Sequence, residues 1–330
     1  MNSSLRYVEG SEPGYTRRRK GKTWQYLTPD GRVLRSARTI ARLNAIALPP
    51  AYTDAWFARD AQAHLQATGI DARGRKQYRY HPEFRAQCEE AKFTGCLAFG
   101  AALPRIRTAV DRDLRRRDLS RDRVIAAVIR LLDMGKVRVG NRAYARHNRS
   151  FGATTLRNRH VTIAGARIEL DYVGKSGIRH RIAIEDRRLA RIIKRCRDEP
   201  GQELFQYRDH DQLRAVTSGD VNDWLRRNAG NFTAKNFRTW GASTIAFGML
   251  AQAHGQMRIT PLLEEVAQRL GNTPAVARKS YVHPALIAAT HHPPEGYAWR
   301  LPAPSRWHSA EERGLLAFLR KFGATPAQSA

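Results

Sequence analysis

The hydrophobic pattern of this 330-residue chain changes its period along the sequence, and this restricts the fold to one that combines sheets with helices. Residues 1 to about 90 contain short alternating runs separated by turn signals, which is typical of β-strands. From about residue 100 apolar residues recur at helical spacing, and only residues 161–184 return to alternation. We therefore predict an α+β fold with a small β-rich N-terminal domain, residues 1–90, and a larger, mainly α-helical domain, residues 91–330.

Turn-forming residues separate the predicted elements of the N-terminal domain. Residues 23–35 consist of two short runs joined by a Pro-Asp-Gly turn at 29–31, which indicates a hairpin. Residues 37–46 predict a short helix, and residues 69–85 are rich in turn signals and end in alternating aromatic and basic residues. Since no flexible linker follows, we place the domain boundary in a loop or helix near 82–100.

The larger domain is predicted to hold several helices and one small sheet. Residues 121–135 place apolar side chains at helical spacing, and Gly135 is expected to end that helix. Residues 161–184 predict a three-stranded antiparallel sheet with turns at Ala164-Gly165 and at Gly174-Lys175-Ser176-Gly177. Further helices are expected at 186–197, 217–230, 236–253, 259–271 and 309–322.

Capping residues mark some of these helix ends. Ser218 is a candidate N-cap, and Thr273-Pro274 fits an N-cap followed by the first residue of a short helix. Ser309 and Glu312 have the spacing of a capping box. The last residues, 323–330, are expected to be mobile.

The net charge of +28 indicates a polyanionic partner, because self-repulsion at this level is costly without one. Most of the cations are arginines, which suit bidentate contacts with phosphate. The basic residues run through the whole folded sequence, and no lone basic amphipathic helix suggests a membrane surface, so we expect nucleic acid. Charge alone does not separate a nucleic-acid binder from an enzyme.

The sequence lacks the motifs of nucleotide- and metal-dependent enzymes. It has no GxxxxGK[ST] loop, CxxC pair, HExxH motif or tight carboxylate cluster, so we expect no cofactor and no metal. The three cysteines, Cys88, Cys96 and Cys196, are interpreted as reduced, small buried side chains. The lack of a signal peptide and of a long apolar run favours a cytoplasmic, nucleoid-associated protein.

Phosphoryl transfer without a metal needs cations around the phosphate, a nucleophile and a proton donor. Arg138 follows a predicted helix, Lys175 stands at the tip of a predicted hairpin, and Arg238 lies near the start of a helix. Tyr281 is placed on the short helix that begins after Thr273. Each of these residues also has an ordinary structural explanation, so spacing alone does not identify a site.

The motifs around these residues resemble those of the type IB DNA topoisomerases, in particular the small poxvirus-like bacterial branch. The resemblance runs from about residue 25 to 290 and keeps the family's order of motifs. These motifs are Arg-Val-Gly-Asn from Arg138, Val-Gly-Lys at Lys175, Thr-Ala-Lys-Asn-Phe-Arg-Thr-Trp with Lys235 and Arg238, and Gly-Asn-Thr-Pro followed by six residues and Tyr281.

The resemblance implies an isomerase that relaxes supercoiled double-stranded DNA without ATP or metal, as a monomeric two-lobed clamp. Tyr281 would attack the scissile phosphate and form a 3′-phosphotyrosyl link. Arg138 and Arg238 would stabilise the phosphorane-like state, and Lys175 would protonate the departing 5′-oxygen with a relay through Arg138. Lys235 would support the same phosphate pocket.

Two further expectations follow from the resemblance. Nine residues before the tyrosine many members have histidine, whereas this chain has Asn272, whose amide donates a hydrogen bond but carries no charge. We expect Asn272 to donate to a non-bridging phosphate oxygen. The segment Gly-Arg-Lys-Gln-Tyr-Arg-Tyr-His resembles the family's DNA-contacting strand, so Gln77, Tyr78 and Tyr80 are implied in major-groove contacts, with packing in the sheet as the alternative for the tyrosines.

Two other classes of protein remain as alternatives. Tyrosine recombinases share the Arg-Lys-Arg-Tyr chemistry, but their second arginine usually stands in H-x-x-R. Here Lys235 and Arg238 form K-x-x-R followed by Thr-Trp, which favours a topoisomerase. A non-catalytic architectural protein that binds DNA or RNA would explain the charge but not the ordered motifs.

Overall fold

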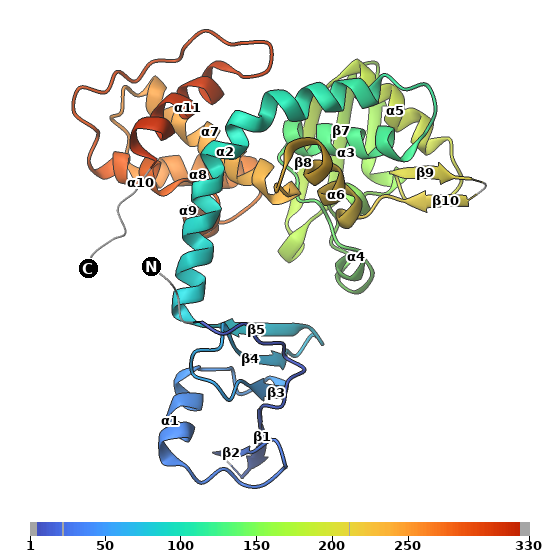
Figure 1. The fold of residues 1–330 in the computed structure, drawn as a ribbon. Helices are drawn as coiled ribbons and strands as arrows, with labels where there is room; N and C mark the ends of the chain where they lie inside the picture. The colour runs from blue at the N-terminus through green and yellow to red at the C-terminus, as the bar shows by residue number, and fades with distance from the viewer. Residues whose placement is uncertain (1–4, 22, 211, 324–330) are drawn as a thin grey trace. The chain divides into compact units, whose positions relative to one another are not determined.

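The structure is a computed structural model that describes residues 5–21, 23–210 and 212–323. The segment expected to be mobile, 323–330, lies outside the described residues except for Gly323. The chain divides into two compact units, residues 1–92 and 93–330, whose elements are labelled in Figure 1. Helices and antiparallel sheets occur together, which confirms the α+β prediction at this level.

The N-terminal unit is built on a five-stranded antiparallel sheet in the order β2-β1-β3-β4-β5. Its elements are β1 (Tyr15–Lys20), β2 (Thr23–Leu27), α1 (Ala37–Ala45), β3 (Thr53–Phe57), β4 (Leu65–Ile70) and β5 (Lys76–Tyr80). The predicted hairpin at 23–35 is only partly formed. Its turn closes, but the second run contributes only the single bridge Leu27–Val33, and the strand pairing of β2 is with β1.

One long helix, α2 (Pro82–Leu114), contains the division between the units, which falls between Lys92 and Phe93. Helical structure therefore begins at Pro82, whereas the hydrophobic pattern of the sequence predicted helices only from about residue 100. The prediction for the cysteines is wrong at one position. Cys96 and Cys196 are buried, but Cys88 is exposed, since it lies on a stretch of α2 whose neighbouring side chains are exposed as well.

The larger unit holds most of the helices, a three-stranded antiparallel sheet in the order β6-β7-β8, and the strand pair β9-β10. The strands are β6 (Val161–Ala164), β7 (Arg167–Val173), β8 (Arg179–Glu185), β9 (Gln206–Asp209) and β10 (Gln212–Ala215). The helices are α3 (Arg121–Gly135), α4 (Arg142–Asn148), α5 (Arg187–Arg197), α6 (Ser218–Ala229), α7 (Ala234–Gln252), α8 (Ile259–Leu270), α9 (Pro274–Ser280), α10 (Pro284–His291) and α11 (Ala310–Phe322). None of the described helices combines the length and apolar character needed to cross a membrane.

Side-chain caps fix several helix ends, in part at other residues than predicted. Thr273 and Ser309 cap α9 and α11 as predicted, and Ser309 forms its capping box with Glu312. The cap of α6 is Thr217 rather than Ser218, because Thr217 completes a reciprocal box with Asp220. A one-residue shift of this kind is expected where two hydroxyl side chains are adjacent.

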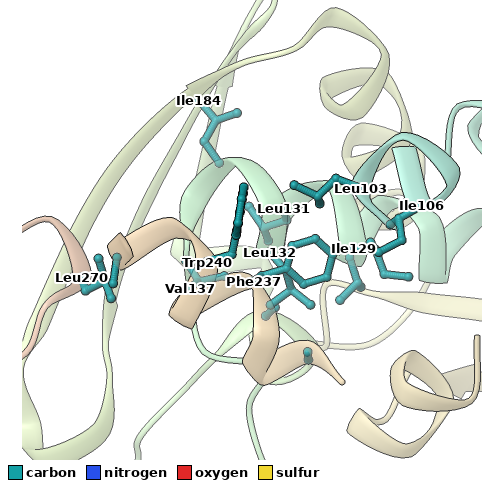
Figure 2. Packing of buried hydrophobic residues seen from close by; sticks show 14 of the residues in the cluster. Leu103, Ile106, Ile129, Leu131, Leu132, Val137, Ile184, Phe237, Trp240 and Leu270 are labelled. Atoms are coloured by element: carbon teal, nitrogen blue, oxygen red, sulfur yellow. The ribbon is translucent and has the colours of Figure 1, made fainter. Parts of the chain in front are cut away.

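The packing of α3 against α7 forms the centre of the core (Figure 2). Phe237 and Trp240 of α7 lie among Ile129, Leu131 and Leu132 of α3, and each of the five side chains is at most 2% exposed. Burial of a large apolar side chain stabilises the fold by about 1.5–3 kcal/mol. This packing holds the end of α3 and the first turns of α7 in fixed register.

Helix α3 ends at Gly135 as predicted, and Lys136, the next residue, holds this end against α7. Gly135 is the last helical residue, but the left-handed cap is Lys136, with φ of 53°. The Lys136 side chain lies across Gly241, where a Cβ would come within 2.2 Å of Lys136 Cδ. The absence of a side chain at Gly241 is therefore what lets this segment approach α7.

A buried ion network attaches the C-terminal helix α11 to the same core. The Arg107 guanidinium donates to both carboxylate oxygens of Asp133 at 2.8 Å and to Glu312 at 2.7 and 2.8 Å. Trp240 Nε1 donates to Glu312 at 3.0 Å. The pKa of Glu312 is lowered to about 2, because its hydrogen bonds to Arg107 outweigh the effect of burial. The network thus joins α2, α3, α7 and α11.

Candidate active site

The loop that carries Arg138 is held by the 3-10 turn Ala153–Thr155. Ala153 N donates to Arg138 O at 2.8 Å, and Thr154 N donates to Val139 O at 2.7 Å. Gly152 permits this approach, since a Cβ there would lie 2.6 Å from Arg138 O. These backbone contacts fix the position from which the Arg138 side chain extends.

Arg238, near the start of α7, is 3% exposed and connects three segments. Its Nη2 donates to Leu270 O at 3.0 Å at the end of α8, and its Nη1 donates to Lys136 O after α3. Burial, together with the neighbouring charge of Arg138, lowers the pKa of Arg238 below its usual value. Two cationic side chains thus share one largely buried region.

Tyr281 lies immediately after α9, as its C-cap, and not within the helix as predicted. Its backbone N–H closes the last turn by donating to Ala277 O at 3.1 Å. The fully buried Ser243 of α7 donates from Oγ to Tyr281 O at 3.3 Å and accepts from His283 N at 3.0 Å. Ser243 therefore anchors the backbone of Tyr281 to the helix that carries Arg238. Ser243 could not be predicted from the sequence, because a small polar residue in an apolar helix has no pattern of its own.

The Tyr281 ring lies beneath the Arg238 guanidinium, with 4.9 Å between Cζ and the ring centroid. Burial alone would raise the pKa of Tyr281, but the charges of Arg238, Arg138 and Lys235 outweigh it and lower this pKa below 10. Of the tyrosines in the described chain with a shifted pKa, Tyr281 alone is shifted downward; burial raises the pKa of Tyr26, Tyr80, Tyr172 and Tyr297. Tyr281 is thus the tyrosine whose surroundings favour the phenolate.

Arg138 and Asn272 are brought together across the site, since Arg138 Nη2 donates to Asn272 Oδ1. On three side chains of the site, one buried donor each has no hydrogen-bond partner among the described residues: Arg138 Nη1, Asn272 Nδ2 and Arg238 Nε. Buried polar groups are almost always paired, and an unpaired one costs about 1–3 kcal/mol. Donors without acceptors, two of them on cations, suit a ligand with several anionic oxygens, such as a phosphate.

Lys175 stands on the predicted hairpin tip, in the turn Lys175–Gly177 between β7 and β8. Gly174 N donates to Ile178 O at 2.7 Å and closes the turn. The Lys175 side chain is exposed, and no contact of the described residues joins it to Arg138, Arg238 or Tyr281. Lys235, one turn before Arg238 on α7, is also exposed.

The residues named for the N-terminal domain lie on β5, an edge strand of the five-stranded sheet. Tyr78 and Tyr80 are 50% and 39% exposed, and their rings stack with centroids 6.1 Å apart. Gln77 Nε2 donates to Asp71 Oδ2 at 2.9 Å, so this amide nitrogen already has a partner. The strand thus presents two tyrosine rings outward.

The arrangement in the larger unit suits nucleophilic attack on a phosphate ester. It combines a tyrosine of lowered pKa, two neighbouring arginines in a largely buried region, and unpaired N–H donors. In the described ranges, no three His, Cys, Asp or Glu side chains come together as a metal site would require.

Comparison with known proteins gives concordant matches. A family model for the catalytic core of eukaryotic DNA topoisomerase I matches residues 81–292, and one for the N-terminal domain of bacterial DNA topoisomerase IB matches residues 23–71. The chain is 32% identical to DNA topoisomerase 1B of Acanthamoeba polyphaga mimivirus over 285 residues, 82% of this chain and 85% of that protein. It is 21% identical to DNA topoisomerase 1B of Vaccinia virus (strain Copenhagen) over 249 residues, 72% of this chain and 75% of that protein.

A solved structure of the XerH site-specific recombinase, in a post-cleavage complex with palindromic difH substrate, is also similar. It shares 15% sequence identity at a TM-score of 0.37, and the match covers 55% of this chain and 47% of that one. A likeness of this size is too slight to argue from.

Proposed function

Because this chain belongs to the type IB DNA topoisomerase family, we propose that it relaxes supercoiled double-stranded DNA by cutting and rejoining one strand through Tyr281. The observation that carries the proposal is the position of Tyr281 beneath Arg238, together with the unpaired buried donors of Arg238, Arg138 and Asn272. A scissile phosphate placed there would receive these donors on its non-bridging oxygens.

In the proposed step, Tyr281 loses its phenolic proton to solvent and its oxygen bonds to the phosphorus. The bond from phosphorus to the 5′-oxygen breaks, and Lys175 supplies the proton that this oxygen takes up. One phosphodiester is exchanged for another, so the strand is held by a 3′-phosphotyrosyl bond and no ATP is consumed. Rotation of the free 5′-end relaxes the superhelical strain, and attack by the 5′-hydroxyl reverses the exchange.

The two units are proposed to act as the lobes of a clamp on the duplex, with residues 93–330 supplying catalysis. In the N-terminal unit, the exposed Tyr78 and Tyr80 would contact the DNA, with Gln77 beside them on β5. A net charge of +28 supports many phosphate contacts. Affinity should then fall steeply with salt, by about 0.9 in log units per phosphate contact for each tenfold increase. We expect one chain to suffice, so the enzyme would act as a monomer.

Relaxation of a negatively supercoiled plasmid in EDTA without ATP is the direct test. The purified chain should convert the plasmid to relaxed topoisomers, because side chains alone supply the proposed chemistry, and gel electrophoresis would follow the products. A plasmid with a paired recombination site serves as the comparison. Activity confined to that plasmid would favour a tyrosine recombinase, and DNA binding with no strand cutting would favour an architectural protein.

Replacement of Asn272 by alanine is expected to slow strand cleavage roughly 10- to 100-fold, because it removes an uncharged donor to the phosphate. Single-turnover cleavage on short duplex DNA would measure this. Asn272→His keeps a ring donor and should recover most of the rate, with a pH dependence that the asparagine enzyme lacks. An unchanged rate in Asn272→Ala would show that this amide does not contact the phosphate.

A further inference from the structure

His180 lies on β8 directly opposite Tyr172 of β7, and it is 8% exposed. The two rings are stacked, with centroids 5.1 Å apart and planes 10° apart. The alternation of β8 places His180 on the same side as Ile182 and Ile184, which is the inward side. Its ring is therefore held against the Tyr172 ring on the inward face of the sheet, near the end that carries the turn of Lys175.

The edge of this ring fills the space beside two glycines from distant parts of the chain. A Cβ at Gly174 would lie 2.6 Å from His180 Cδ2, and a Cβ at Gly271 would lie 2.1 Å from His180 Cε1. Real Cβ atoms do not approach this closely, so both positions must lack a side chain while the ring is present. Gly271 is also left-handed, with φ of 60° at the end of α8.

Each of these glycines immediately precedes a residue of the proposed reaction. Gly174 is followed by Lys175, and Gly271 is followed by Asn272. The His180 imidazole thus contacts the backbone next to Lys175, the proposed acid, and the backbone next to Asn272, the proposed phosphate donor.

The ring is electrically neutral at physiological pH. Burial, followed by the charges of Arg138 and Arg238, lowers the pKa of His180 to about 4. A protonated ring would add a third cation beside these arginines. The two arginines therefore favour an uncharged ring at His180, and the two glycines leave room for a flat one.

We propose that His180 is a positioning residue that sets the spacing between the Lys175 turn and the Gly271-Asn272 segment, so that acid and donor reach the same phosphate. This inference rests on the proposed function, in which Lys175 protonates the 5′-oxygen. It assigns His180 no contact with DNA. Its effect is exerted through the two backbones that it separates.

The test compares cleavage of two substrates at a site mapped with the wild-type protein. One is ordinary duplex DNA, and the other carries sulfur in place of the 5′-bridging oxygen. A thiolate leaves without protonation far more readily than an alkoxide, so the sulfur substrate bypasses the proton donor. Lys175→Ala is the reference for a lost acid, because its defect should be relieved by sulfur.

His180→Ala is expected to cleave ordinary DNA about 100-fold more slowly than wild type, as a displacement of about 1 Å can produce. On the sulfur substrate its deficit should shrink at least tenfold. His180→Phe retains a flat, neutral ring and should stay within about fivefold of wild type on both substrates. If His180→Ala does not fold, as judged by thermal unfolding, His180→Leu replaces it, since leucine has similar bulk but is not flat.

His160 offers a matched control. It is also 8% exposed, has its pKa lowered to about 4 by burial, and packs against Phe151 with ring centroids 4.4 Å apart. His160→Ala should lower the unfolding temperature without any difference between the two substrates.

Two results would overturn the inference: cleavage by His180→Ala within threefold of wild type, or an equal deficit on both substrates. Failure of the wild-type protein to cleave either substrate would instead overturn the proposed function itself. The two failures are therefore distinguishable within one experiment.

Discussion

Tyr281→Phe is expected to lose both plasmid relaxation and the covalent protein–DNA adduct, by a factor on the order of 10⁴ or more, while DNA affinity is retained. The substitution removes only the oxygen that would attack the phosphate. The phenylalanine ring can keep its place beneath Arg238 and leave the fold intact. Relaxation gels, denaturing gels of trapped adduct and a filter-binding assay measure the three quantities.

Tyr297→Phe is the matched control for this substitution. Tyr297 is also partly buried, but its burial raises the pKa rather than lowering it, and it packs against Trp299 and α11. The control should relax DNA at nearly the wild-type rate. Relaxation by Tyr281→Phe would show that another group is the nucleophile.

Arg238→Ala is expected to reduce cleavage by about 100- to 1000-fold and to move its pH profile to higher pH. The first effect is the loss of a cation at the phosphate. The second follows because Arg238 lowers the pKa of Tyr281, so its removal raises that pKa and leaves less phenolate at neutral pH. Single-turnover cleavage measured between about pH 6 and 10 separates the two effects.

Arg238→Lys is the comparison variant for Arg238→Ala. A lysine keeps the positive charge near Tyr281 but cannot bridge Lys136 O and Leu270 O as the guanidinium does. Its pH profile should remain close to that of wild type while its rate falls. A profile in Arg238→Ala that does not move would contradict the role of Arg238 in favouring the phenolate.

The elements best predicted from the sequence are those whose pattern is local and strong. The helix at 121–135 is observed within the same bounds, and the strands at 161–184 follow their alternation. Partners distant in sequence were not predictable. The run after the Pro-Asp-Gly turn forms only the bridge Leu27–Val33, whereas β2 pairs along its length with β1, a segment outside residues 23–35.

In the candidate site, too, local motifs were predictable from the sequence, whereas contacts between distant segments were not. Its motifs singled out Tyr281, Arg138 and Arg238, yet the sequence could not show that Arg138 contacts Asn272 or that Ser243 holds the backbone of the tyrosine. The inward position of His180 was implied by the alternation of its strand, but the glycines that it touches lie in other segments. Contacts between segments are fixed only by tertiary packing.

The buried network of Arg107, Asp133 and Glu312 has a consequence for the order of synthesis. Domains fold as they emerge during translation, N-terminal parts first. Tyr281 emerges from the ribosome before α11, yet Glu312 on α11 neutralises Arg107 and holds Trp240, two residues beyond Arg238. Until α11 docks, Arg107 and Asp133 lack their third partner, and α7 lacks one of its supports. A nascent chain that already exposes Tyr281, the proposed nucleophile, would therefore be poorly able to cut DNA, and this competence would arise only late in synthesis.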